Sequence, residues 1–340
     1  GRIIMELVEK DIKVSDIMTP AAFRNALIVH SAIGGSTNAT LHLPSIAREL
    51  AYEMPIELFD EINHQVPHLG NLNPSGKHLT ESFWFAGGVP YVQLLLQDML
   101  DLDVMTVTGR TLGENLEDLR RDNFFERGLG YLANYQLTRD EVIFPVEKAT
   151  EKGSVAILKG NIAPEGSVIK YSAVALSQRS FTGPARVFNE EEDAYRAVVD
   201  KKIQPGDVIV IRYEGPRGCG MPEMLMTTEA IVCDESLNGH VALITDGRFS
   251  RGAAIGHISP EAAAGGPIAF IEEGDLIHYD IEARRLDLVG VDGRQVTPEE
   301  AADILARRSK KGVLPRPARK GFYKRYTEHA LSAMQGAGLD

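Results

Sequence analysis

The sequence predicts an α/β protein in which a helix-rich N-terminal part precedes a β-barrel-like domain with peripheral helices. Up to about residue 145 the chain reads as helices separated by glycine loops. After Glu151 it breaks into short β-branched runs that are bounded by Gly, Pro or Asp. Because no repeat, low-complexity tract or long linker is present, the change of period alone places the domain boundary between residues 145 and 152.

The clearest helix start in the N-terminal part is Thr19-Pro20, where a capping hydroxyl precedes a proline at the first helical position. This helix continues over residues 21–29. The periodicity predicts further helices at 38–52, 56–64, 90–99 and 112–121.

The C-terminal part is predicted to contain eight strands, at 154–158, 167–171, 185–188, 207–213, 240–245, 267–271, 276–280 and 285–289. Helices at 190–201 and 222–232 interrupt them. The segment 159–168 favours a turn, since its glycines, asparagine and proline suit turn chemistry. Thr297-Pro298 begins another capped helix, and a basic segment at 316–325 leads into a last helix near 326–334.

Composition and charge favour a globular protein that binds a small molecule. The 340 residues are 44% hydrophobic and 25% charged, which allows a sizeable core. The formal net charge of −12 and a pI near 5.3 argue against a nucleic-acid surface, because that requires a clustered basic face.

The sequence also predicts a cytoplasmic location, with no membrane partner. No apolar run approaches the length of a membrane span, and no secretory signal pattern is present. The two cysteines, Cys219 and Cys233, are too few for a disulfide scaffold or a four-thiolate metal site, and they fit a reducing compartment. The start at Gly1 inside an amphipathic pattern favours a fragment or a processed chain.

A glycine pair precedes three small polar residues at 34–38. Ser36 and Thr37 are candidate substrate-binding residues, because a helix N-terminus with hydroxyls can hold a carboxylate. An ordinary capped helix start explains the same residues.

Glu223 is the candidate metal ligand. It lies after Gly220-Met221-Pro222, where a carboxylate suits either the first turn of a helix or a Mg²⁺ ion. Mg²⁺ commonly takes one or two protein carboxylates and leaves positions for substrate oxygen and water.

Ser250 is the candidate catalytic residue, at the end of the glycine-containing segment 244–250. A turn or cap serine is the alternative interpretation. No Gly-x-Ser-x-Gly elbow surrounds it, which disfavours a hydrolase triad, and no His-Glu-x-x-His motif is present. Cys219, between two glycines, either faces the same site as Glu223 or is a small buried side chain.

Taken together, the sequence resembles the family of dihydroxy-acid dehydratases and sugar-acid (aldonate and phosphogluconate) dehydratases. The matching segments follow the family's order along the chain: 32–43, 86–90, 106–115, 160–166, 183–188, 211–216, 245–250 and 255–262.

The resemblance implies a hydro-lyase that removes water from a 2,3-dihydroxy acid to give a 2-keto acid. In the family an iron–sulfur cluster acts as Lewis acid on the departing hydroxyl, Mg²⁺ holds the carboxylate end of the substrate, and a serine alkoxide takes the C2 proton. By motif, Glu223 corresponds to the Mg²⁺-binding glutamate and Ser250 to the base. The cluster cysteines belong to segments upstream of this chain, so Cys219 and Cys233 are not assigned to the cluster.

The family's architecture makes residues 1–148 the C-terminal part of an N-terminal α/β domain. Residues 149–340 then form a β-barrel-like catalytic domain with C-terminal helices, in a homodimer or homotetramer. A branched-chain dihydroxy-acid dehydratase is the leading expectation. An aldonate dehydratase is the alternative, because the segment 215–220 has the length seen in some sugar-acid members. A cluster-free module that binds small acids or assembles subunits is the rival from another class.

Overall fold

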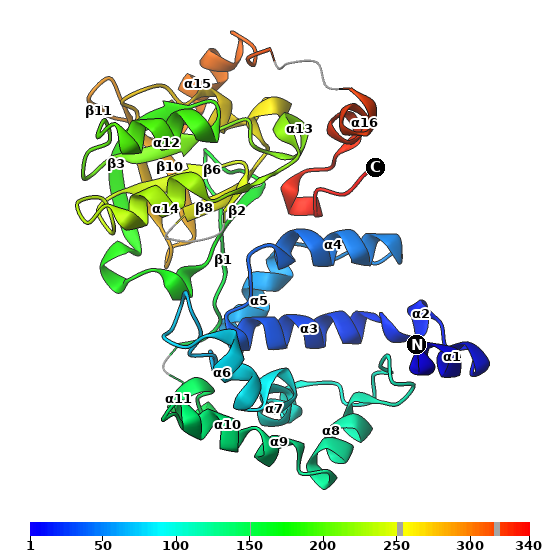
Figure 1. Cartoon of the computed structure of the whole chain (residues 1–340). Coiled ribbons are helices and arrows are strands. Elements are labelled where there is room, and N and C mark those ends of the chain that lie inside the picture. The colour runs from blue at the N-terminus through cyan, green and yellow to red at the C-terminus, as the bar shows by residue number, and fades with distance from the viewer. Residues whose placement is uncertain (150, 250–253, 316–319) are drawn as a thin grey trace. The chain divides into compact units, whose positions relative to one another are not determined.

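The computed structural model describes residues 1–149, 151–249, 254–315 and 320–340, which divide into two compact units (Figure 1). Unit 1 comprises Gly1–Ser36, Ile46–Met54 and Leu58–Ser154. Unit 2 comprises Thr37–Ser45, Pro55–Glu57 and Val155–Asp340. Unit 2 therefore includes two short pieces of the N-terminal half, and the boundary expected between residues 148 and 149 stays a prediction.

Unit 1 is built mainly from helices, and its longest helix begins where the sequence predicts. The Thr19 hydroxyl accepts a hydrogen bond from Ala22 N (3.2 Å), and the helix ends at the left-handed Gly34. Its buried face includes Leu27 and Ile28. The helices in this part of the chain are α1 (Arg2–Glu9), α2 (Val14–Ile17), α3 (Pro20–Ile33), α4 (Ala39–Glu49), α5 (Glu57–Gln65), α6 (Thr80–Phe85), α7 (Gly88–Leu95), α8 (Leu112–Arg121), α9 (Phe124–Arg127), α10 (Leu129–Asn134) and α11 (Arg139–Val142), with 3-10 turns at Gln97–Met99 and Val146–Lys148.

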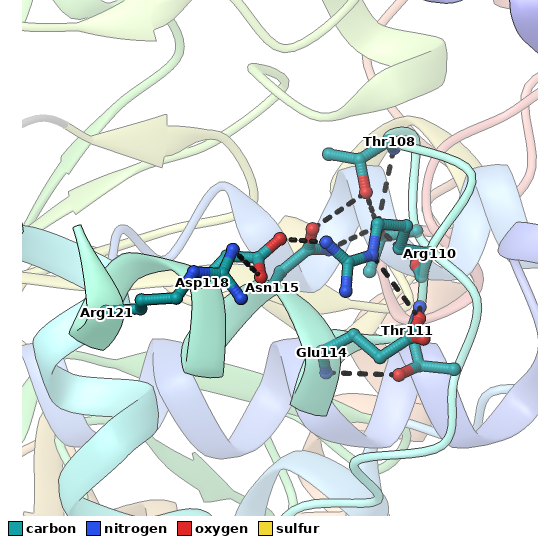
Figure 2. A network of polar contacts seen from close by, with 8 residues as sticks. Thr108, Arg110, Thr111, Glu114, Asn115, Asp118 and Arg121 are labelled. Atoms are coloured by element: carbon teal, nitrogen blue, oxygen red, sulfur yellow. Dashed lines mark hydrogen bonds and ion pairs between the residues drawn. The ribbon is translucent and has the colours of Figure 1, made fainter.

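A polar network fixes the loop that leads into α8 (Figure 2). Asn115 Nδ2 donates to Thr106 Oγ1 (2.7 Å), and Thr108 Oγ1 donates to Asn115 Oδ1 (2.9 Å). Arg110 pairs with Asp118 on the helix, and Thr111 and Glu114 form a capping box. The polar residues of segment 106–115 thus hold the loop and cap the helix, which explains why the segment contains threonines, an asparagine and a glutamate.

Unit 2 contains a nine-stranded mixed sheet in the order β1-β2-β8-β6-β4-β3-β9-β10-β11. The neighbours β3, β4, β6 and β8 are parallel, and the remaining pairs are antiparallel. The strands are β1 (Ala156–Leu158), β2 (Gly166–Ile169), β3 (Ser180–Phe188), β4 (Val208–Ile211), β6 (Ala242–Thr245), β8 (Ala254–Ser259), β9 (Leu276–Asp280), β10 (Arg285–Val291) and β11 (Arg294–Gln295), with a separate two-stranded sheet of β5 (Glu223–Met224) and β7 (Arg248–Phe249).

The large sheet curls until its β1 edge meets β10. Lys159, directly after β1, forms a parallel bridge with Arg285, and its N–H donates to Arg284 O (3.0 Å). An added Cβ at Gly160 would lie 1.9 Å from Leu286 O, so only glycine fits this junction. The expectation of a β-barrel-like domain is confirmed, and the segment predicted as a turn joins β1 to β2.

The central strands are buried on both faces, which explains their uninterrupted apolar runs. In β4, Val208 and Val210 belong to the core inside the curled sheet, whereas Ile209 and Ile211 pack in a second core. The second core includes residues of α12 (Glu191–Val199) and partly buried residues of α14 (Met226–Cys233). Figure 1 shows these two helices in front of the sheet. The other helices of unit 2 are α13 (Pro216–Cys219), α15 (Pro298–Ser309) and α16 (Gly321–His329), with 3-10 turns at Tyr171–Ala173, Leu176–Gln178, Ala262–Ala264, Pro267–Phe270 and Ala333–Gln335.

The sequence-based assignments differ from the structure in several places. The segment 267–271, predicted as a strand, forms the 3-10 turn Pro267–Phe270, which begins at a proline and buries Ile268 and Phe270. The helix predicted at 222–232 begins only at Met226, and β5 precedes it. Strand β8 was not predicted. Within the described ranges, no helix combines the length and the apolar character that a bilayer crossing requires.

Candidate active site

Three carboxyl side chains follow the parallel strands β4, β6 and β8 at the same edge of the sheet. They are Glu214, Asp246 and Glu261, and all three are buried. The C-terminal ends of parallel strands meet at one edge, which is where ligands usually bind in open α/β sheets. The hydrogen bonds of each carboxyl decide whether it is available to a ligand.

Asp246 ties three loops together. Its Oδ2 accepts from Tyr213 N (3.0 Å) and Ala262 N (2.8 Å), and its Oδ1 accepts from Glu214 N (2.9 Å). Complete burial raises the pKa of Asp246 above its ordinary value, although these N–H groups oppose the shift. Asp246 therefore holds the loops after β4 and β8 in place.

Glu261 holds the start of α13. Its carboxylate accepts from Arg217 N (2.7 Å) and Gly218 N (3.2 Å). Burial, reinforced by the nearby Asp246, raises the pKa of Glu261 to about 7. A Cβ at Gly215 would lie 2.0 Å from Glu261 Oε2, which explains the glycine there.

Glu214 joins α12 to Cys219. Its Oε1 accepts from Glu191 N (3.0 Å), and its Oε2 accepts from Cys219 Sγ (2.5 Å). Burial raises the pKa of Glu214. The Cys219 thiol thus donates to a buried carboxyl. Cys233 is exposed at the end of α14.

Glu223 has a different environment from these three acids. It is exposed on β5, in parallel register with Arg248 on β7. The expectation that it lies in the first turn of a helix is wrong, because Arg248 Nε donates to Met221 O (2.8 Å) and the chain pairs as a strand before α14 begins. Glu223 therefore presents its carboxylate at the edge of the small sheet.

The fit of Glu223 to a metal can be judged from its surroundings. Within the parts of the chain that the structure describes, no group of three or more His, Cys, Asp or Glu side chains is arranged to hold a metal ion. One exposed carboxylate nevertheless suits Mg²⁺, which keeps several water or substrate oxygens. Ser250, the predicted base, follows β7 directly in sequence but lies outside the described residues.

Ser36 and Thr37, the predicted substrate-binding residues, have contrasting environments. Ser36 is exposed, and its carbonyl accepts from His30 Nε2 (2.8 Å). Thr37 is buried in unit 2, where its carbonyl accepts from Thr40 Oγ1 (2.8 Å). A substrate contact at either residue stays a prediction.

His257 is a buried polar residue near the site that sequence reasoning missed. It lies in β8, where the register against β2 shifts between Gly256 and Ser259, and its φ of 57° is left-handed. Its Nδ1 lies 3.2 Å from Thr40 Oγ1. Because Thr40 already donates its only hydroxyl proton to Thr37 O, Nδ1 must be the donor, and Nε2 carries the lone pair.

This arrangement keeps the imidazole neutral. Burial, with Arg248 and His42 nearby, lowers the pKa of His257 to about 3. Among the described residues, Nε2 has no hydrogen-bond partner. The signal in the sequence is a single histidine within the otherwise apolar run Ala254–Ser259.

Comparison with known sequences identifies the family. Residues 141–337 match the sequence profile described as dihydroxy-acid/6-phosphogluconate dehydratase C-terminal, and residues 1–115 match the N-terminal profile of the same family. The chain belongs to the dihydroxy-acid/6-phosphogluconate dehydratase family. The expected family is thereby confirmed.

Individual members of this dehydratase family align along essentially the whole chain. Proteins named dihydroxy-acid dehydratase from Ruminiclostridium cellulolyticum and Moorella thermoacetica are each 45% identical to it over 100% of its residues, and one from Clostridium novyi is 46% identical over 99%. The chain spans 58% of the length of each of these relatives. The activity of the whole protein is therefore treated below as a proposal.

Proposed function

We propose that the protein containing this chain dehydrates a 2,3-dihydroxy carboxylic acid to a 2-keto acid, as a dihydroxy-acid dehydratase of branched-chain amino-acid biosynthesis. The observation that carries the proposal is the 45% identity to proteins of that name over 100% of the chain, which includes Glu223 and Ser250. The half-buried Arg248 on β7, next to Glu223 on β5, supports an anionic substrate at this edge.

The proposed reaction removes one water molecule. The base takes the proton from C2, the C2–C3 double bond forms as the C3 hydroxyl leaves with a proton as water, and the resulting enol tautomerises to the 2-keto acid. We assign proton abstraction to Ser250 and metal ligation to Glu223. Mg²⁺, when bound, supplies positive charge that orients the substrate carboxylate and favours an ionised serine hydroxyl.

The described cysteines do not fit an iron–sulfur cluster. Cys219 Sγ donates a hydrogen bond to Glu214, and Cys233 is exposed on α14. Iron–sulfur clusters, in contrast, are held by several cysteines together. We therefore assign the cluster ligands to the part of the protein outside this chain and assign no step to Cys219 or Cys233. A homodimer or homotetramer in the cytoplasm belongs to the same proposal.

The direct test is anaerobic expression of the complete gene with iron and Mg²⁺. Formation of 2-keto acid is then followed from 2,3-dihydroxyisovalerate, gluconate, xylonate and arabinonate. We expect turnover of the first to exceed that of the three sugar acids. A cluster-loaded protein that turns over none of the four would contradict the proposal and favour a small-acid-binding or assembly module.

The assigned base is tested by Ser250→Ala in the same protein. Loss of a general base typically lowers the rate by about 10²- to 10⁴-fold, and we expect that loss with the cluster spectrum unchanged. Wild-type activity in this variant would show that another group takes the C2 proton.

A further inference from the structure

Arg248 has unused hydrogen-bonding capacity at the edge of the small sheet. Its Nε donates to Met221 O (2.8 Å), which fixes the plane of the guanidinium group. The described residues provide no hydrogen bond or ion pair to its Nη1 and Nη2. Because directly paired residues of neighbouring strands project to the same face, Arg248 and Glu223 lie side by side on that face.

Two other half-buried arginines of unit 2 bind carboxylates. Arg186 contacts Glu273 (2.6 Å) and Asp207 (3.1 Å), and Arg308 contacts Asp275 (2.5 Å). The chain as a whole carries 48 acidic against 36 basic residues, so carboxylates are abundant partners. Among the described residues, the two outer nitrogens of Arg248 thus have no partner, and they can donate to an anion.

Two polar side chains near Arg248, other than Glu223, do not pair with its guanidinium group. His257 on β8 is buried and neutral, and Tyr326 on α16 donates its hydroxyl to Ala337 O (2.8 Å). Arg248 acts on the pKa of both side chains, lowering that of His257 and opposing the burial that raises that of Tyr326. All of these residues belong to unit 2.

We propose that Arg248 also binds the carboxylate of the hydroxy acid, which Mg²⁺ on Glu223 would orient, with Nη1 and Nη2 donating to its two oxygens. A guanidinium group matches a carboxylate with two parallel hydrogen bonds, and the bond to Met221 O orients it in advance. The assignment rests on the proposed function for the identity of the acid. The two hydrogen bonds from Arg248 would select an acid over its amide, since a neutral amide offers only one oxygen acceptor.

The test compares the acid with its primary amide. The complete gene product, loaded with iron and Mg²⁺, is titrated calorimetrically with 2,3-dihydroxyisovalerate and with 2,3-dihydroxyisovaleramide. In Arg248→Gln we expect affinity for the acid to fall about 10- to 100-fold, the loss typical of a charged hydrogen bond, while affinity for the amide changes less than about threefold. Arg248→Lys is expected to lose an intermediate amount, because an ammonium group keeps the charge without the fork.

Arg294→Gln is the matched control, since Arg294 is an exposed arginine of unit 2 that pairs with Glu300. It is expected to bind both ligands as the wild type does. Equal losses for acid and amide in Arg248→Gln would overturn the assignment and show that Arg248 acts only through Met221. Tight binding of the acid without turnover would instead contradict the proposed function alone, and failure of the wild-type protein to prefer acid over amide would overturn the Arg248 assignment.

Discussion

The acidic residues of unit 2 divide into two groups with opposite surroundings. Glu214, Asp246 and Glu261 are buried at the edge of the large sheet, and their oxygens accept backbone N–H groups or the Cys219 thiol. Glu223 is exposed on the small sheet beside Arg248. Position at the end of a parallel strand therefore does not make a carboxyl a ligand. The buried group holds the loops together, whereas the proposed Mg²⁺ ligand lies on the exposed edge of the small sheet.

The largest effect is expected from Asp246→Ala. Three buried N–H groups lose their acceptor, so we expect the free energy of unfolding to fall by about 3–5 kcal/mol. Urea denaturation of the complete protein measures it. Asp303→Ala, at an exposed position of α15, is the control and should change stability by less than about 0.5 kcal/mol. Equal losses of stability in the two variants would contradict the view that the buried acids, unlike the exposed ones, hold the fold together.

The pH dependence of stability provides the second test. The pKa of Glu261 is raised to about 7 in the folded protein from 4.5, so the native state binds the proton more tightly. Stability contributed by Glu261 is complete below pH 4.5 and decreases as the pH rises to 7, by roughly 3 kcal/mol. Glu261→Gln should remove this decrease between pH 5 and pH 8. An unchanged slope in the variant would assign the dependence to other groups, such as Asp246 or Glu214.

Glu223→Gln is expected to act on metal binding and not on folding. Replacing a charged oxygen ligand should raise the Mg²⁺ concentration that supports half-maximal activity by about 10-fold or more, while the urea midpoint remains that of the wild type. Glu165→Gln, another exposed acid of unit 2, is the control. A large loss of stability in Glu223→Gln would place this residue with the buried acids.

The smallest effect is expected from His257→Asn. Asparagine tolerates the left-handed φ and can place its amide N–H near Thr40 Oγ1, so it should be about 1 kcal/mol more stable than His257→Leu. Thermal unfolding of the two variants measures the difference. Equal stabilities would show that the bond to Thr40 contributes nothing.

His257 also has a pH signature opposite to that of Glu261. Its pKa is about 3 when folded and 6.5 as a free group, so the unfolded chain binds the proton first and stability falls as the pH drops below 6.5. This acid-side loss should be absent from His257→Asn.

The sequence anticipates the elements whose pattern is local. The capped start of α3, the buried runs of β4 and β6 and the capping box of α15 all follow from residues close together in the chain. Strand β8 was missed because Gly256 and His257 interrupt its apolar run, and only pairing with β2 and β6 shows it to be a strand. Sequence reasoning therefore located the barrel but not all of its strands.

The candidate site was anticipated in part and for a limited reason. Glu223 was chosen from its glycine-rich neighbourhood, and its exposure is compatible with that choice, but its assignment to a helix failed because the pairing with Arg248 is a contact between distant segments. Arg248 could not be identified as a site residue from local pattern, and the only local signal for His257 is its place in the apolar run of β8. Their proposed roles depend on hydrogen-bond partners from distant segments, which only the three-dimensional structure shows.

The contact between the two ends of unit 2 has a consequence for protein synthesis. Gly336 packs directly on the backbone of α4, where an added Cβ would lie 2.8 Å from Leu41 O and 2.7 Å from Ser45 N. Almost the whole chain separates these partners in sequence, so α4 emerges from the ribosome long before the residues that cover it. Unit 2 can reach its final packing only after Gly336 has left the ribosome, and until then the first turns of α4 lack the partners that His257 and Gly336 provide.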